Sequence, residues 1–308
     1  MESSAIGIFD SGLGGLTVAR EIARAMPHES LVYLGDTARC PYGPRDLDEV
    51  RRFVLEIGSW LEQRQVKVMV VACNTATAAG LALAQQAFSV PVIGVIEPGA
   101  RAAVMATRNR KVGVIGTVGT IDSGAYSDAV RALDAGVTVF STATPRFVEI
   151  VEEGLRRGTG PVEDLLSDTT EVFIRPSFYE MARDYLDPLK RTGVDTLVLG
   201  CTHYPLLSAA IQQVVGVNVT LISSAQETAR EVVETLERRD QLAGGEVQGT
   251  LGFATTGDPG EFQRLGSRVF GRPLGPVESV DVRRLAALPD PAAVRLMVER
   301  ASEEASCA

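Results

Sequence analysis

The hydrophobic positions of the chain form short continuous runs that alternate with longer segments of helical spacing. Apolar, β-branched runs of strand length occupy residues 6–9, 31–34, 66–72, 90–95, 111–116, 137–140, 195–200 and 217–222. Apolar residues spaced as on one face of a helix occupy residues 16–25, 47–63 and 75–87. Strands that are buried on both faces are apolar along their whole length, so this alternation predicts βαβ units with parallel sheets.

Two stretches of the chain repeat one pattern. An apolar strand runs into a cysteine at residues 66–75 and again at 194–203. The repeat predicts an α/β protein of two similar flavodoxin-like lobes, each placing one cysteine where a strand ends and a helix begins. We expect a first lobe of residues 1–97 plus 226–308, which carries Cys73, and a second lobe of residues 98–225, which carries Cys201. The extra length between residues 154 and 178 is predicted to be an insertion in the second lobe.

The last part of the chain is less regular. Glycine and proline between residues 244 and 276 predict turns around short elements, among them a helix at 261–270. Beyond about residue 281 the Ala- and charge-rich sequence predicts a helix with a frayed tail, in which Cys307 is incidental.

Composition limits the kinds of partner. The chain has 308 residues and a formal net charge of −9, which disfavours nucleic acid or an anionic membrane as a general partner. It contains no apolar stretch of the roughly 18 residues that span a bilayer, and no secretory signal is evident at its start. The four cysteines are widely scattered, which does not indicate a disulfide framework and predicts a reducing cytosol.

Four polar clusters follow predicted strands, at residues 10–12, 36–43, 73–75 and 201–204. Ligand sites of open α/β sheets lie at the carboxyl ends of strands, so we expect the clusters to form one site. Helix N–H groups beside Cys73 and Cys201 would lower the pKa of each thiol and favour the thiolate. Both cysteines could instead be small buried hydrophobic residues, but their matching positions in the repeat favour a chemical role.

Two thiols that face one carbon atom would suit the inversion of a stereocentre. A proton must leave one face and another must arrive on the opposite face, so one thiol starts as a thiolate base and the other as an acid. Asp10 and His203 are residue types that could manage the protons of the two thiols. His203 could also be a structural histidine that bonds a nearby carbonyl group.

Other chemistries fit the sequence less well. The glycine-rich loop at residues 10–17 does not complete a GxGxxG nucleotide fingerprint. A zinc site formed by Cys73, Cys201 and His203 would lack CxxC or HExxH spacing. Pyridoxal phosphate requires a lysine for its Schiff base. The chain has three lysines, Lys67, Lys111 and Lys190. They fall at strand starts or at a charged helix end, so we expect racemisation, if it occurs, to need no cofactor.

Residues 8–18, 33–43, 71–77 and 199–205 resemble the motifs of bacterial glutamate racemases, within the wider aspartate/glutamate racemase family. The similarity extends to about residue 280, and the chain departs from the family in its longer segment at 155–178 and its tail after about 281. The resemblance implies an isomerase without cofactor or metal, with an active site in the cleft between two lobes. It also implies a cytoplasmic homodimer that interconverts L- and D-glutamate for peptidoglycan synthesis, with no membrane or nucleic-acid partner.

The resemblance also implies roles for individual residues. Cys73 would act on D-glutamate and Cys201 on L-glutamate, assisted by Asp10 and His203 respectively. The residues implied to bind the substrate are Asp10, Ser11, Pro41, Tyr42, Gly43, Asn74, Thr75, Thr77, Thr117, Thr202 and His203. Asp36 and Glu152 are similar to further acidic residues near the site of the family.

Two other functions remain open on the sequence alone. The first is racemisation of another amino acid such as aspartate, although the surroundings of residues 41–43 and 202–204 resemble the glutamate-specific branch. The second is a noncatalytic binding protein whose two lobes close on a ligand. Such a protein would still bind its ligand after the loss of either thiol and would exchange no proton at the α-carbon.

Overall fold

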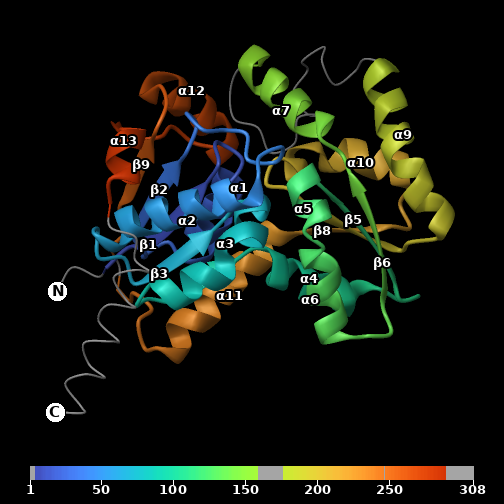
Figure 1. Ribbon diagram of the computed structural model, residues 1–308, viewed down its shortest axis with the longest axis horizontal. Coiled ribbons are helices and arrows are strands. Elements are labelled where there is room, and N and C mark those ends of the chain that lie inside the picture. The colour runs from blue at the N-terminus through green and yellow to red at the C-terminus, as the bar shows by residue number, and fades with distance from the viewer. Residues whose placement is uncertain (1–3, 159–175, 246, 289–308) are drawn as a thin grey trace.

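Two parallel β-sheets form the framework of the molecule (Figure 1). The structure is a computed structural model, and it describes residues 4–158, 176–245 and 247–288. The six-stranded sheet has the order β10-β9-β2-β1-β3-β4, and the four-stranded sheet has the order β6-β5-β7-β8. The first sheet contains β1 (Ile6–Asp10), β2 (Leu31–Gly35), β3 (Val68–Val71), β4 (Val92–Gly94), β9 (Leu251–Thr255) and β10 (Val277–Ser279). The second sheet contains β5 (Lys111–Gly116), β6 (Thr138–Ala143), β7 (Thr196–Gly200) and β8 (Thr220–Ser223). The predicted α/β class with parallel sheets is therefore confirmed.

Helices cover the faces of both sheets. Around the first sheet lie α1 (Leu16–Ala25), α2 (Leu47–Glu62), α3 (Asn74–Ala87), α11 (Ser224–Arg238), α12 (Pro259–Phe270) and α13 (Val282–Ala286). Around the second lie α4 (Ile96–Ala106), α5 (Val118–Asp122), α6 (Ala125–Leu133), α7 (Arg146–Arg157), α9 (Pro176–Thr192), η1 (Tyr204–Leu207) and α10 (Ser208–Val215). The helices predicted at 16–25, 47–63, 75–87 and 261–270 all form, with ends shifted by at most two residues.

Burial on both faces explains why the strands are apolar throughout. Along β1, Ile6 and Ile8 pack in the core that contains α1 and α11, whereas Phe9 packs in the core that contains α2 and α3. Each face of the sheet therefore needs its own apolar layer.

The predicted repeat is visible in the topology. The order β2-β1-β3-β4 of the first sheet matches the order β6-β5-β7-β8 of the second. Cys73 follows β3 and Cys201 follows β7, so each cysteine stands after the third strand of its repeat. Strands β9 and β10 extend the first sheet beyond the repeat, in a region where the sequence predicted only turns and short elements.

The two cysteines lead into different local structures. Cys73 is the N-cap of α3, as expected. After Cys201 the chain makes a turn and the 3₁₀ helix η1, and α10 begins only at Ser208, so the prediction of a helix beginning directly after Cys201 was wrong. Pro205 lacks an N–H group and stands at the start of η1, a position that tolerates proline.

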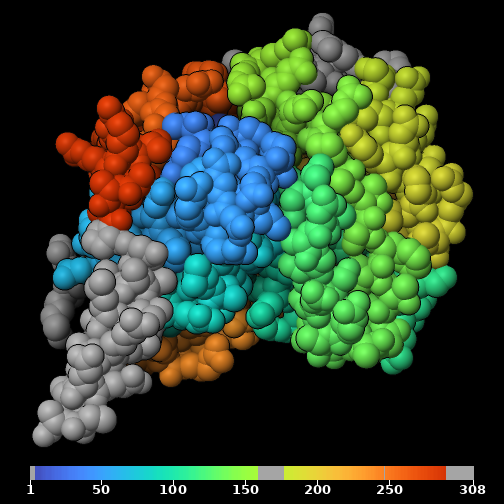
Figure 2. All heavy atoms as spheres, viewed as in Figure 1, coloured from blue at the N-terminus to red at the C-terminus, as the bar shows by residue number. Residues whose placement is uncertain are grey.

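The two sheets with their helices lie side by side and meet along a broad boundary (Figures 1 and 2). Helix α11 packs against both α1 and α4, so it contacts elements of each sheet. The lobe limits expected after residues 97 and 225 stay a prediction. Residues 159–175 of the expected insertion, most of the expected tail and Cys307 lie outside the described residues.

Candidate active site

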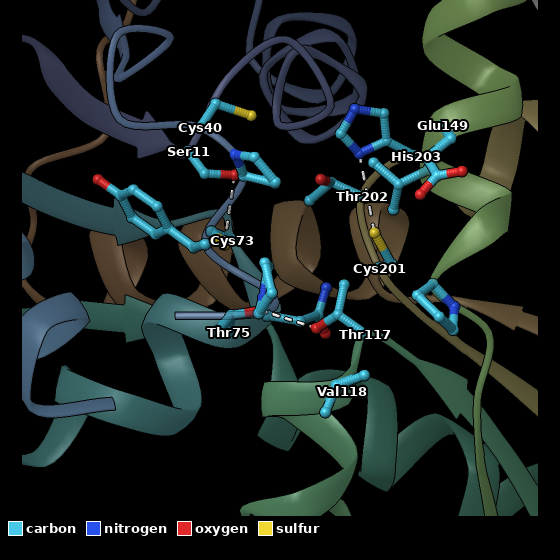
Figure 3. A pocket seen from close by; sticks show the side chains of 17 residues that line it. Ser11, Cys40, Cys73, Thr75, Thr117, Val118, Glu149, Cys201, Thr202 and His203 are labelled. Carbon is cyan, nitrogen blue, oxygen red and sulfur yellow. Dashed lines mark hydrogen bonds between the residues drawn. The ribbon is translucent and has the colours of Figure 1, made fainter. Parts of the chain in front are cut away.

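A cavity of about 180 Å³ lies between the carboxyl ends of the two sheets (Figure 3). Residues that follow β1, β2 and β3 line it from one side, and residues that follow β5, β6 and β7 line it from the other. All four polar clusters expected at strand ends contribute to this cavity. The predicted residues that line it are Ser11, Pro41, Tyr42, Gly43, Cys73, Asn74, Thr75, Thr117, Cys201, Thr202 and His203.

Four predicted residues lie outside the lining. Asp10 is fully buried beneath it, and Thr77 donates its hydroxyl hydrogen bond to the backbone oxygen of Val71. Asp36 accepts a hydrogen bond from the Tyr42 hydroxyl, and Glu152 lines an adjacent hollow instead.

Cys73 belongs to the first half of the site. Its Sγ atom donates to the Oγ atom of Ser11 at 3.8 Å. Burial raises the pKa of Cys73 to about 12, with a further contribution from the charge of Asp10, although hydrogen bonds from Ala76 and Ser11 oppose the shift. The N–H group of Ala76 in the first turn of α3 lowers this pKa, as expected, but desolvation of the charged form outweighs it, so the net shift is upward.

Cys201 belongs to the second half. Its Sγ atom lies 3.7 Å from Nδ1 of His203, whose Nε2 atom lies 3.9 Å from Oε1 of Glu152. Burial also raises the pKa of Cys201, and a hydrogen bond from the backbone of His203 opposes this. The predicted pairing of Cys201 with His203 is present in the geometry, and Figure 3 shows Cys73 and Cys201 on opposite sides of the cavity.

Asp10 joins the two halves of the site. Its carboxylate accepts a hydrogen bond from the backbone N–H of Gly12 at 3.0 Å and one from the hydroxyl of Thr202 at 3.4 Å. Thr17 adds a second link, since its hydroxyl donates to the backbone oxygen of Thr202 at 3.2 Å. The end of β1 and the first turn of α1 therefore hold the segment that carries Cys201.

Hydrogen-bonding groups without a protein partner lie at the cavity. Nδ2 of Asn74 is buried without a hydrogen-bond partner, and so is Nε2 of His203, on the side of the ring that lies toward Glu152. Thr75 and Thr117 both line the cavity, and their hydroxyl oxygen atoms lie 2.9 Å apart. No lysine or arginine occurs among the described residues of the lining. An anionic ligand would therefore be held by neutral N–H and O–H groups.

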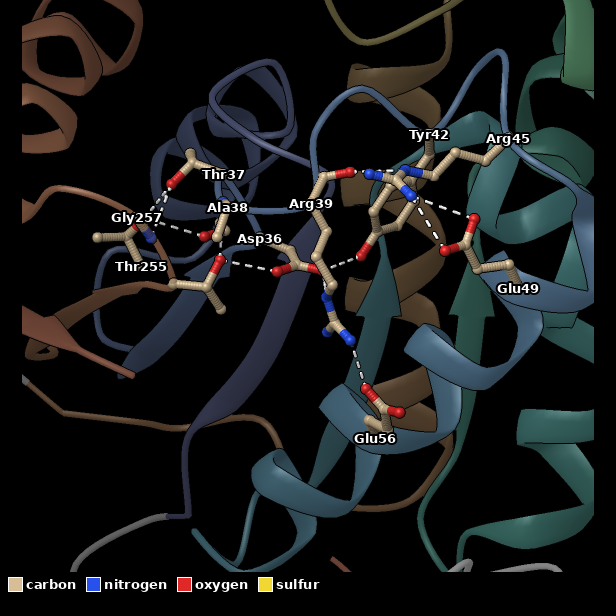
Figure 4. A network of polar contacts seen from close by, with 12 residues as sticks. Asp36, Thr37, Ala38, Arg39, Tyr42, Arg45, Glu49, Glu56, Thr255 and Gly257 are labelled. Atoms are coloured by element: carbon tan, nitrogen blue, oxygen red, sulfur yellow. Dashed lines mark hydrogen bonds and ion pairs between the residues drawn. The ribbon is translucent and has the colours of Figure 1, made fainter. Parts of the chain in front are cut away.

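A buried polar network supports the loop that carries Tyr42 (Figure 4). Asp36 accepts hydrogen bonds from Nε of Arg39 at 2.7 Å, from Oγ1 of Thr256 at 2.7 Å and from the hydroxyl of Tyr42. Arg39 also pairs with Glu56. Burial, followed by the charge of Asp36, raises the pKa of Tyr42, so this phenol remains protonated. Its hydroxyl is engaged by Asp36, which makes Asp36 a support for the loop.

Six lining residues were not among the predicted site residues: Cys40, Pro44, Val118, Pro145, Val148 and Glu149. Cys40 lies within the polar cluster at residues 36–43, Pro44 directly follows that cluster, and Pro145 follows the strand β6, so the strand-end rule could have found them. Val148 and Glu149 lie on α7, and only the packing of that helix brings them to the cavity.

The structure also places the residues of the rival chemistries. Lys67 forms a buried pair with Glu29, and the other two lysines bond residues outside the cavity. In the part of the chain that the structure describes, no cluster of three or more His, Cys, Asp or Glu side chains could hold a metal ion. None of the described helices has the length and apolar character needed to cross a membrane.

Comparison with known proteins identifies relatives of the chain. The sequence pattern of the family described as Asp/Glu/Hydantoin racemase matches residues 11–232. A glutamate racemase of Bacillus cereus is 47% identical over 276 residues, which cover 90% of this chain and 96% of that protein. The crystal structure of a glutamate racemase isoform from Bacillus anthracis is 44% identical, with a TM-score of 0.82 and coverage of 92% and 99%. A glutamate racemase from Francisella tularensis, solved in complex with D-glutamate, has a TM-score of 0.79 at 28% identity, with coverage of 91% and 98%.

Proposed function

We propose that this chain, which belongs to the Asp/Glu/hydantoin racemase family, interconverts L- and D-glutamate by proton transfer between two cysteines. One observation carries the proposal: two buried thiols, Cys73 and Cys201, stand on opposite sides of one cavity. A carbon atom held between them would have a proton donor or acceptor on each face. The glutamate racemases among its relatives support glutamate as the substrate.

The lining supports binding of an amino acid with two carboxylates. Neutral donors, among them the amide of Asn74 and the hydroxyl groups of Thr75, Thr117 and Thr202, would hold the carboxylate oxygens. Hydrogen bonds to an ionised group are stronger than neutral ones, so several of them can replace a cationic side chain. The cavity would then orient the α-carbon between the sulfur atoms.

Two proton transfers complete the proposed reaction. The Cys201 thiolate removes the α-proton of L-glutamate and becomes a thiol, and the electron pair of the C–H bond stays on the substrate. The Cys73 thiol then delivers its proton to the opposite face of the α-carbon and becomes a thiolate. The product is D-glutamate, and the reverse reaction begins from the opposite protonation states.

The raised thiol pKa values set a requirement on this chemistry. Burial favours the neutral form of Cys73 and Cys201, so the reaction must supply a charge that stabilises one thiolate. The ammonium group of the amino acid is such a charge, because a cation within about 4–6 Å lowers the pKa of an acid. We infer that substrate binding itself helps to generate the base. His203, 3.7 Å from Cys201, is placed to accept or return a proton on its side.

The family also suggests a cellular role. We propose that the D-glutamate is used in peptidoglycan synthesis, that the enzyme works in the cytoplasm without a cofactor, and that it is a homodimer. Dependence of growth on added D-glutamate after depletion of the protein would test the first point. The sedimentation coefficient of the purified chain would test the last.

Circular dichroism of the purified protein with L-glutamate, D-glutamate or aspartate tests the proposed function. We expect the signal of either glutamate enantiomer to decay without added cofactor, and the signal of aspartate to persist. In Cys73→Ala and Cys201→Ala, turnover should fall by several orders of magnitude in both directions, because base and acid are needed together. Binding of glutamate without any decay by the wild-type protein would instead favour a binding protein.

A further inference from the structure

Tyr126 contacts both halves of the site without lining the cavity. It lies on α6, is 2% exposed, and donates a hydrogen bond from its hydroxyl to Oδ1 of Asn74 at 2.8 Å. Its ring lies against Gly200, where an added Cβ atom would be 3.0 Å from the ring carbon Cε2. Asn74 directly follows Cys73 and Gly200 directly precedes Cys201.

The direction of this hydrogen bond follows from the surroundings of the phenol. A side-chain hydrogen bond with Ser224 lowers the pKa of Tyr126. A hydrogen bond has this effect when it is donated to the phenol oxygen, because it then stabilises the charged form. The proton of the phenol is therefore available for Oδ1 of Asn74. Burial raises the pKa of Tyr126, so the phenol keeps this proton at neutral pH.

The hydrogen bond fixes the orientation of a carboxamide at the cavity. Asn74 is 2% exposed and lines the cavity, and its Nδ2 atom is buried without a hydrogen-bond partner. With Oδ1 engaged by Tyr126, the amide presents N–H groups to a ligand. The reversed amide would present an oxygen atom, which repels a carboxylate. No lysine or arginine among the described lining residues could compensate for that error.

We propose that Tyr126 is a positioning residue, which holds the carboxamide of Asn74 so that its N–H donates to a carboxylate of the substrate. This inference rests on the proposed function, since it takes glutamate as the ligand. The effect passes from one sheet to the other, because Tyr126 lies beside the second sheet and Asn74 begins α3 beside the first. The arrangement thus ties substrate binding to the correct docking of the two halves.

The test is a double-mutant cycle with Tyr126→Phe and Asn74→Ala. Tyr126→Phe keeps the ring and removes the donor, so KM for both glutamate enantiomers should rise about tenfold while kcat changes by less than about threefold. Asn74→Ala should raise KM at least as much. In the double variant, the loss of the phenol should add nothing, because the group that it orients is gone.

Controls separate positioning from a general loss of structure. Tyr179→Phe removes a phenol that donates to Gln213 on the surface, so its KM should equal that of the wild type. The dissociation constant of D-glutamate, measured by calorimetry for each variant, provides a readout that does not require turnover.

Two results would overturn the inference. One is an unchanged KM and dissociation constant in Tyr126→Phe. The other is a rise of KM in the double variant that equals the product of the rises in Tyr126→Phe and Asn74→Ala. If the wild type binds glutamate without racemising it, the proposed function fails while the calorimetric cycle still decides the role of Tyr126. If it binds no glutamate, both fail.

Discussion

Replacing Cys73 with serine should change how the free energy of unfolding depends on pH. The size of the change follows from the raised pKa of the buried Cys73 thiol. The pKa of Cys73 rises from 9.0 to about 12 on folding, so the folded protein keeps a proton that the unfolded chain loses above pH 9. A rise in pH therefore favours unfolding. The stabilisation is complete below the unfolded pKa and is lost progressively as the pH approaches the folded pKa.

The size of the effect can be worked from these two values. At pH 8 the unfolded thiol is still mostly protonated and the contribution lost is below about 0.1 kcal/mol. At pH 10.5 the unfolded thiol is mostly ionised and the folded one is not, so about 2 kcal/mol is lost. This figure hardly depends on the folded pKa, provided that the folded pKa stays above about 11.

The assay is urea unfolding at several pH values between 8 and 10.5, for the wild type and Cys73→Ser. Serine does not titrate in this range, whereas Cys40, Cys201 and the tyrosines are common to both proteins and cancel in the comparison. We expect the wild type to lose about 2 kcal/mol more than the variant over this interval. Ser89→Ala, at an exposed position, should run parallel to the wild type. Parallel curves for the wild type and Cys73→Ser would refute the conclusion that burial governs this thiol.

Two further predictions concern packing and a buried ion pair. In Gly14→Ala the new Cβ atom would lie 2.3 Å from Oγ1 of Thr202 and 2.7 Å from Nδ1 of His203. We therefore expect kcat/KM, measured by circular dichroism, to fall by about two orders of magnitude or more. Near wild-type activity would contradict the close contact. Lys67→Met leaves the carboxylate of Glu29 buried without the ammonium that lies 2.6 Å from it, so chemical unfolding should show a loss of about 3–5 kcal/mol. Adding Glu29→Gln should restore part of that stability, and a further loss in the double variant would contradict this explanation.

Much of the fold could be predicted because parallel strands carry a strong local pattern. Eight of the ten described strands lie in apolar runs that are recognisable in the sequence. Strand β10 lies at the edge of the first sheet and has only three residues, none of them buried. Strand β9 lies inside the sheet, between β2 and β10, but Gly252 and Thr255 interrupt its apolar residues. Neither strand forms a continuous apolar run, so their pairing depends on the sheet that is already present.

The site divides in a similar way. Residues within two positions of a strand end, such as Ser11, Cys73 and Thr117, could be placed at the cavity from the sequence, because strand ends gather at one edge of a sheet. The contribution of Glu149 depends on how α7 packs, and no local pattern contains that information. The thiol pKa values were beyond reach for the same reason, since their main cause is burial by residues distant in the sequence.

The two-cysteine mechanism is tested most directly by racemisation of L-glutamate in deuterium oxide, stopped after a small fraction has reacted. Each thiol carries one proton that exchanges with solvent, and the two sulfur atoms serve opposite faces. The D-glutamate formed should therefore carry deuterium at the α-carbon, while the remaining L-glutamate should retain hydrogen. Mass spectrometry after separation of the enantiomers measures both. Equal early incorporation of deuterium into recovered L-glutamate and product D-glutamate would contradict the two-cysteine mechanism.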